Sequence, residues 1–216
     1  DIMSIAQLAL PEEWYGKEFT YFHQDETDRG TRPISEELGL LCYLSAYGKM
    51  HRDKIRIALS NMNLAEMCTS NINIVDWGCG QGLATFVFLD YLAEQGIECE
   101  VDSITLIEPS ALAIENAELF LTQRQKDENT QIRTINKLFG DLSERDFEGI
   151  GSGATFHLYS NILDVPGINM KELSSWLNVF PTKDNYIISA SPKYWSGDER
   201  IRTFFSYLNN ARILWS

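Results

Sequence analysis

The residues whose types and spacing most clearly indicate a functional site lie in the segment 72–82, INIVDWGCGQG. This segment joins an apolar run to an acidic residue and three alternating glycines. The β-branched run predicts a strand buried in a parallel sheet. Glycines directly after such a strand let the backbone turn tightly and approach a ligand with no Cβ in the way. Backbone N–H groups of the turn and of the next helix would face that ligand. The pattern predicts a site for a nucleotide-like cofactor.

The spacing of the glycines narrows the class of ligand. A dinucleotide fingerprint reads G-x-G-x-x-G, whereas this chain has Gly78, Gly80 and Gly82 at every second position, with Asp76 two residues ahead. The Lys and Ser/Thr of a triphosphate-binding P-loop are missing from this turn. A carboxylate here suits a ligand that carries an ammonium and a sulfonium better than one that carries phosphates. The alternative is a glycine-rich turn that binds nothing.

The motif Asp76-x-Gly78-x-Gly80-x-Gly82 resembles the first motif of the class I S-adenosylmethionine-dependent methyltransferases. In that family the acidic residue and the glycines hold the methionine part of the cofactor. The resemblance covers residues 71–195. It implies an α/β fold with a doubly wound, mostly parallel sheet, S-adenosylmethionine as the cofactor and methyl transfer as the activity.

Two further acidic residues resemble cofactor ligands of the same family. Glu108 ends the predicted second strand, where a carboxylate can accept both hydroxyls of a ribose. Asp141 follows the predicted third strand and resembles the Asp that receives the adenine amino group, with Phe139 and Leu142 as apolar neighbours that could cover the ring. Alternatively, Asp141 is the N-cap of a helix.

The predicted strand 154–160 runs into a loop with two candidate catalytic residues, Asn161 and Asp164. In open α/β sheets, ligands bind beyond the carboxyl ends of the strands. Several family members have an Asn/Asp-Pro-Pro-aromatic motif here that binds a nucleophilic amine, whereas this chain reads SNILD. We expect Asn161 and Asp164 to face the reaction. The alternative is that Asn161 caps a turn and Asp164 caps the next helix.

The chain divides into two parts at the glycine motif. Residues 1–70 predict a helical N-terminal extension or lid, with a helix that starts near 35–37 and continues to 59, and residues 71–216 predict the S-adenosylmethionine-binding domain. The aromatic segment 14–23 is either a flap over the ligand or a hydrophobic staple onto the sheet. His51 is either a satisfied core residue or a catalyst.

A second resemblance concerns the Tyr-containing helical segment 46–54, which is similar to the ribosomal small-subunit methyltransferase-like group. The cysteine-rich elements of that group are absent from this chain.

From residue 71 onward, strands and helices alternate, which predicts a parallel sheet covered on both faces. The expected strands are 72–76, 103–108, 132–138, 154–160 and 185–190, and the expected helices are 83–95, 110–124, 169–179 and 197–210. Only 211–216 remain for the further strands that finish the family's sheet. We therefore expect a truncated C-terminal edge, covered by a partner or by a missing C-terminal segment.

Composition excludes several classes of protein. The 216 residues, 44% hydrophobic, suffice for one buried core. The formal net charge of −13 repels phosphate backbones, so nucleic acid is not the favoured partner. Four cysteines without a C-x-x-C pair argue against a metal site and a disulfide framework and suggest a cytoplasmic protein. No apolar run is long enough to span a membrane.

The sequence thus predicts an S-adenosylmethionine-dependent methyltransferase. Its methyl acceptor is unidentified, with a small molecule or a protein favoured over nucleic acid. The alternative is a catalytically inactive module that binds S-adenosylmethionine or a partner, as part of a longer polypeptide.

Overall fold

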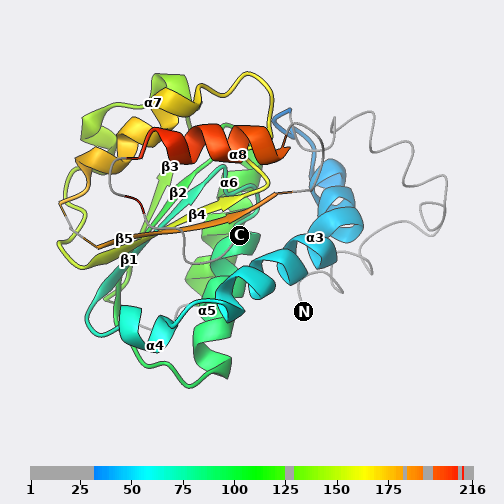
Figure 1. Cartoon of the computed structure of the whole chain (residues 1–216). Helices are drawn as coiled ribbons and strands as arrows, with labels where there is room; N and C mark the ends of the chain where they lie inside the picture. The colour runs from blue at the N-terminus through cyan, green and yellow to red at the C-terminus, as the bar shows by residue number, and fades with distance from the viewer. Residues whose placement is uncertain (1–31, 125–128, 182–183, 192–196, 209–210, 212–216) are drawn as a thin grey trace.

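The computed structural model describes residues 32–124, 129–181, 184–191, 197–208 and 211. A five-stranded parallel sheet lies at the centre, with strand order β3-β2-β1-β4-β5 and helices on both faces (Figure 1). The strands are β1 (Ile72–Trp77), β2 (Val101–Ile107), β3 (Gln131–Ile135), β4 (Ala154–Ser160) and β5 (Asn185–Ala190). The predicted fold class is confirmed, because this sheet is consistent with the class I methyltransferase α/β fold.

Helices α3 (Glu37–Ser60) and α4 (Leu64–Met67) come before the first strand, β1, in the chain, and the other helices alternate with the strands or follow them. These are α5 (Leu83–Glu94), α6 (Ala111–Arg124), α7 (Met170–Ser175) and α8 (Gly197–Ser206), with 3-10 turns η3 (Phe139–Asp141), η4 (Glu144–Phe147) and η5 (Trp176–Val179). Most predicted bounds agree within a few residues. β3 ends three residues before the predicted end, because the Lys137 N–H donates to the Ile135 carbonyl and turns the chain. The predicted helix 169–179 is α7 followed by η5.

Burial on both faces explains why the strands read as apolar runs. All six residues of β1 are buried. Ile74 belongs to the core cluster that contains α5, whereas Val75 and Trp77 belong to the cluster on the other face. The side chain of Asp76 follows the strand's alternation to the α5 side, where its carboxylate contacts Thr85.

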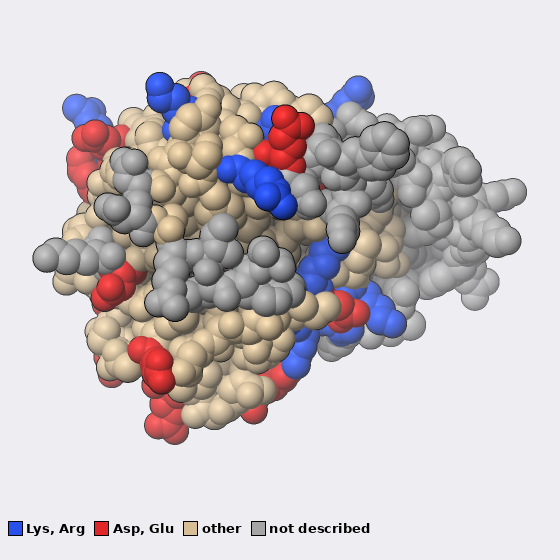
Figure 2. All heavy atoms as spheres, in the orientation of Figure 1, with Lys and Arg blue, Asp and Glu red and all other residues tan. Residues whose placement is uncertain are grey.

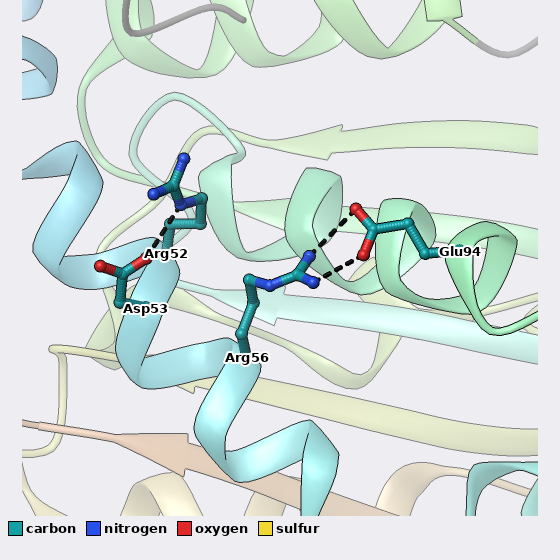
Figure 3. Close-up of polar contacts among 4 residues, drawn as sticks. All are labelled: Arg52, Asp53, Arg56 and Glu94. Atoms are coloured by element: carbon teal, nitrogen blue, oxygen red, sulfur yellow. Dashed lines mark hydrogen bonds and ion pairs between the residues drawn. The ribbon is translucent and has the colours of Figure 1, made fainter.

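Helix α3 packs against α5 and β5, at one edge of the sheet (Figure 1). Arg56 of α3 donates two hydrogen bonds to Glu94 of α5, at 3.1 and 2.6 Å, while Arg52 pairs with Asp53 on α3 itself (Figure 3). Exposed ion pairs contribute little stability alone, so the buried Ile55 and its neighbours supply most of the attachment.

The expected C-terminal edge is only partly described. In the described part of the chain, the sheet ends at β5 on this side. The predicted aromatic segment 14–23 and, except for Ala211, the last residues 211–216 lie outside the described residues. None of the described helices combines the length and apolar character that a membrane span requires.

Candidate cofactor site

The glycine turn joins β1 to α5 and needs glycine for two different reasons. Gly78, Gly80 and Gly82 have φ angles of 69°, 51° and 77°, in the left-handed region that favours glycine. A Cβ at Gly78 would lie 2.6 Å from Cδ1 of Ile162, and one at Gly82 would lie 3.1 Å from Cβ of Ala117. A Cβ at Gly80 would meet nothing within 4 Å. Gly80 is therefore where the turn offers open space to a ligand.

Asp76 lies beneath the turn with no exposed surface. Its Oδ2 accepts hydrogen bonds from the N–H and the hydroxyl of Thr85, at 3.2 and 2.7 Å, in the first turn of α5. Its Oδ1 is buried without a partner among the described residues. Burial raises the pKa of this carboxyl to about 7, against the opposing effect of the Thr85 hydrogen bonds. Asp76 thus fixes the start of α5, and its direct contact with a cofactor stays a prediction.

Glu108 lies next to the turn, as the sequence predicts for a ribose ligand. Its Oε2 accepts from the Gly80 N–H at 3.1 Å, and its Oε1 accepts from the Ser110 N–H at 2.9 Å. Burial raises the pKa of Glu108, and these two N–H donors oppose the rise. The structure therefore brings Gly80 and Glu108, from the ends of adjacent strands, into direct contact.

Asp141 is exposed at the end of η3. The helix-cap alternative is wrong, because Ser143 is the N-cap of η4 and exchanges hydrogen bonds with Asp146. Of the two expected apolar neighbours, Leu142 is buried in the core, so its side chain is not available to cover a ligand. Leu138, 58% exposed, presents apolar surface two residues before Gly140. The adenine contact of Asp141 stays a prediction.

A pocket lies between α3, the glycine turn and the end of β4. Helix α3 contributes Tyr43 and His51, the turn contributes Gly78 and Gly80, and β4 contributes Ser160. Gln81 holds the two sides together, since its Nε2 donates to the Leu40 carbonyl at 2.9 Å. Tyr43 and Gln81 could not be recognised from the sequence, because neither residue type marks a contact between α3 and the turn.

His51 combines features of both alternatives. It is 8% exposed, and its ring lies 6.0 Å from that of Tyr47 and 5.8 Å from that of Tyr43, as expected for a core residue. It also lines the pocket. Burial, with a smaller effect of the Lys54 charge, lowers its pKa to about 4. His51 is therefore neutral at neutral pH.

Asn161 occupies a strained position just after β4. Its φ of 55° lies in the left-handed region, and its N–H donates to the Ala190 carbonyl at 2.6 Å. Its Oδ1 accepts from Lys54 Nζ at 3.0 Å, and its Nδ2 donates to Ser160 Oγ at 3.0 Å. Asn161 thus lies in a bend directly after β4, and its side-chain hydrogen bonds join Lys54 and Ser160, not the backbone of the turn that the capping alternative predicted. Lys54 could not be recognised from the sequence as a partner of Asn161, because it lies 107 residues away.

Asp164 follows in the same loop, and its Oδ1 is buried without a partner among the described residues. It does not cap the next helix, because the side chain of Asn169 accepts from the first N–H groups of α7. Arg200 of α8 holds the loop by donating to the carbonyls of Leu163, Val165 and Ile168, at 2.8–3.0 Å. The loop is thereby fixed beside the end of β4.

No protein-family model and no curated protein matches this chain. Solved methyltransferase structures align with it at low identity. A chain of the complex between the Haloferax volcanii Trm112 methyltransferase activator and a methyltransferase is 14% identical, with 85% of this chain and 75% of that chain covered and a TM-score of 0.47. Magnesium protoporphyrin IX methyltransferase from Synechocystis PCC 6803, solved with bound S-adenosylmethionine, is 16% identical. The alignment covers 87% of this chain and 81% of that chain, with a TM-score of 0.44. The parallel sheet itself, with order β3-β2-β1-β4-β5 and helices on both faces, gives the chain a Rossmann-like fold of the class I methyltransferase type.

Proposed function

We propose that this protein is an S-adenosylmethionine-dependent methyltransferase that acts on a small molecule or a protein. The observation that carries the proposal is the contact between Glu108 and Gly80, which places a carboxylate beside the one position of the turn that is open to a ligand. A methionine moiety at the turn and a ribose at Glu108 would span β1 and β2. The methyl group would then face the loop after β4, where Asn161 and Asp164 lie.

The charges of the site suit this cofactor. Asp76 and Glu108 lie beneath and beside the turn, and burial raises the pKa of both carboxyls. A nearby cation favours an ionised carboxylate, so a ligand with a sulfonium and an ammonium would be stabilised here. A phosphate would be repelled.

The residues of this chain would mainly bind and orient. Glu108 would accept the ribose hydroxyls, Asp141 would accept from the adenine amino group, and the glycine turn would admit the methionine moiety. The bound cofactor supplies an activated methyl group, which an acceptor displaces in line. Alignment of the acceptor and exclusion of water are then the principal contributions of the protein. Asn161 and Asp164 are the polar side chains placed for that alignment.

The surface charge favours a small molecule or a protein as acceptor. On the face shown in Figure 2, Lys and Arg side chains are interspersed with Asp and Glu. With a net charge of −13, the chain would repel a nucleic acid backbone.

The test is calorimetry with S-adenosylmethionine and S-adenosylhomocysteine, followed by methyl transfer from labelled cofactor into fractionated cell extract. We expect both compounds to bind and one fraction to be labelled. If neither compound binds, the proposal is wrong. If both bind and no fraction is labelled, the protein is a cofactor-sensing or partner-binding module.

A further inference from the structure

Lys54 is a partly buried cation of α3 that has no ion-pair partner among the described residues. Its Nζ donates to Asn161 Oδ1 at 3.0 Å, and no described carboxylate oxygen lies within 4.0 Å of it. Burial lowers the pKa of Lys54, and the charge of Asp164 opposes this at longer range. A cation that is partly removed from water without a counter-ion is costly, so the site gains stability if a ligand supplies an anion.

The Lys54 contact also decides what Asn161 can offer a ligand. One lone pair of its amide oxygen accepts from Lys54, and one N–H of its Nδ2 donates to Ser160 Oγ. The ammonium has three donors, of which Asn161 takes one. Three N–H donors therefore remain for a ligand, two on the ammonium and one on the Asn161 amide, against a single remaining lone pair on Asn161 Oδ1. A protonated amine would be repelled by the Lys54 charge, whereas an anion would be attracted.

We propose that Lys54 and Asn161 bind the methyl acceptor and select one that carries an oxyanion, such as a carboxylate. This inference rests on the proposed function, because it assigns the substrate class of the same site. A carboxylate that bridges the remaining N–H groups of Lys54 and Asn161 would accept charge-assisted hydrogen bonds from the ammonium, which are stronger than neutral ones. The Asp164 carboxylate, whose charge acts on Lys54 at longer range, would repel an anion placed close to it.

Three probes of similar shape and different charge test the inference: benzoate, neutral benzamide and cationic benzamidine. Each is titrated by calorimetry into the full chain saturated with S-adenosylhomocysteine. We expect benzoate to bind most tightly. Lys54→Met should weaken benzoate binding by about tenfold and leave benzamide unchanged, because only the charge-assisted bonds are lost. Lys54→Arg should retain the preference for benzoate.

Lys49→Met is the matched control, because Lys49 is an exposed cation on the same helix. It changes the net charge equally and should leave benzoate affinity unchanged. Circular dichroism checks the fold of each variant, and the probe preference of the unmodified protein is informative even if Lys54→Met unfolds.

The outcomes separate this inference from the proposed function. Failure of the parent protein to bind S-adenosylhomocysteine overturns the proposed function. Binding of S-adenosylhomocysteine together with a preference for benzamidine, with no benzoate binding, or with unchanged benzoate affinity in a folded Lys54→Met variant, overturns only the assignment of an oxyanion acceptor.

Discussion

The carboxylate of Glu108 accepts a hydrogen bond of 3.1 Å from the backbone N–H of Gly80, 28 residues earlier in the chain. This bond ties the end of β2 to the turn that follows β1. The second carboxylate oxygen accepts from the N–H of Ser110, at the start of α6. One side chain therefore shapes the turn, so a ligand that binds Glu108 would also depend on the conformation of Gly80.

The first prediction concerns Glu108→Ala. A hydrogen bond to a charged group contributes about 1.5–3 kcal/mol, so the affinity for S-adenosylmethionine should fall by roughly ten- to a hundredfold. S-adenosylhomocysteine should lose affinity equally, because both compounds contain the ribose. Calorimetry measures both, with the exposed Glu115→Ala on α6 as control. A loss below about twofold would leave Glu108 with a structural role only.

The second prediction uses Gly80 and Gly96 as a matched pair. Both have positive φ angles, 51° and 65°, and a Cβ at either meets nothing within 4 Å. Gly96 lies beyond the far end of α5, whose start carries the turn. Valine at either position should cost about 1–2 kcal/mol of unfolding free energy, since left-handed backbone is unfavourable for a residue with a Cβ. Only Gly80→Val should abolish cofactor binding.

Thermal unfolding and calorimetry on the two glycine variants together measure these effects. Unchanged affinity for S-adenosylmethionine in a folded Gly80→Val protein would show that the ligand does not approach the turn. Equal loss of affinity in Gly96→Val would show that the effect is one of stability.

The third prediction concerns stability at acid pH and begins with His157. This buried ring accepts from Trp77 Nε1 at its Nδ1, at 3.2 Å, so its Nε2 carries the proton and donates to Asn185 Oδ1 at 2.8 Å. Burial lowers its pKa from 6.5 to about 4, against the Asn185 hydrogen bond, and His51 is shifted in the same direction. The unfolded chain therefore takes up these protons first. The stability contributed by both groups is full above about pH 6.5 and is lost as pH falls toward 4.

Asp76 has the opposite effect on how the free energy of unfolding depends on pH. Its pKa is raised from 3.8 to about 7, so in the same pH window the folded protein holds a proton that the unfolded chain has released. Its contribution is full below about pH 3.8 and is lost as pH rises through 7. We expect His157→Gln to reduce the acid loss of stability and Asp76→Asn to steepen it. Urea unfolding from pH 4 to 8 gives the slope of the unfolding free energy against pH for each variant. The exposed Glu118→Gln is the charge control. If the unfolding free energy of every variant had the same slope against pH, His157 and Asp76 would not contribute to the pH dependence of stability.

The sequence was sufficient to predict the sheet, and the reason is visible in β1. Each of its six residues is buried, so the strand had to be an uninterrupted run with no exposed polar position, and the glycines after it marked the turn. Its neighbour β4 was predicted with its observed bounds for the same reason.

The contacts of α3 with the glycine turn and with the loop after β4 could not be predicted in this way. Lys54 meets Asn161 across 107 residues, and Gln81 meets Leu40 across 41. Each residue is an ordinary polar or apolar member of its helix or turn, and its role arises only when the tertiary fold brings the segments together. The end of β3 was predicted too late for a local reason, since the Lys137 N–H bonds the Ile135 carbonyl and the Lys137 side chain pairs with Asp146 outside the sheet.

The last prediction separates an enzyme from a binding module at Asn161. Alanine and glycine both remove the amide that bonds Lys54, but only alanine keeps a Cβ at the φ of 55°. Asn161→Gly should therefore be the more stable variant, and both should bind S-adenosylmethionine within a few-fold of the parent. Both should lose methyl transfer in the extract fraction that the parent labels, the pattern of an interaction that matters chiefly in the transition state. If transfer persists in the folded Asn161→Gly protein, the amide does not align the acceptor. If the parent labels nothing and both variants instead lose a macromolecular partner, the enzyme assignment fails and the loop after β4 is a docking surface.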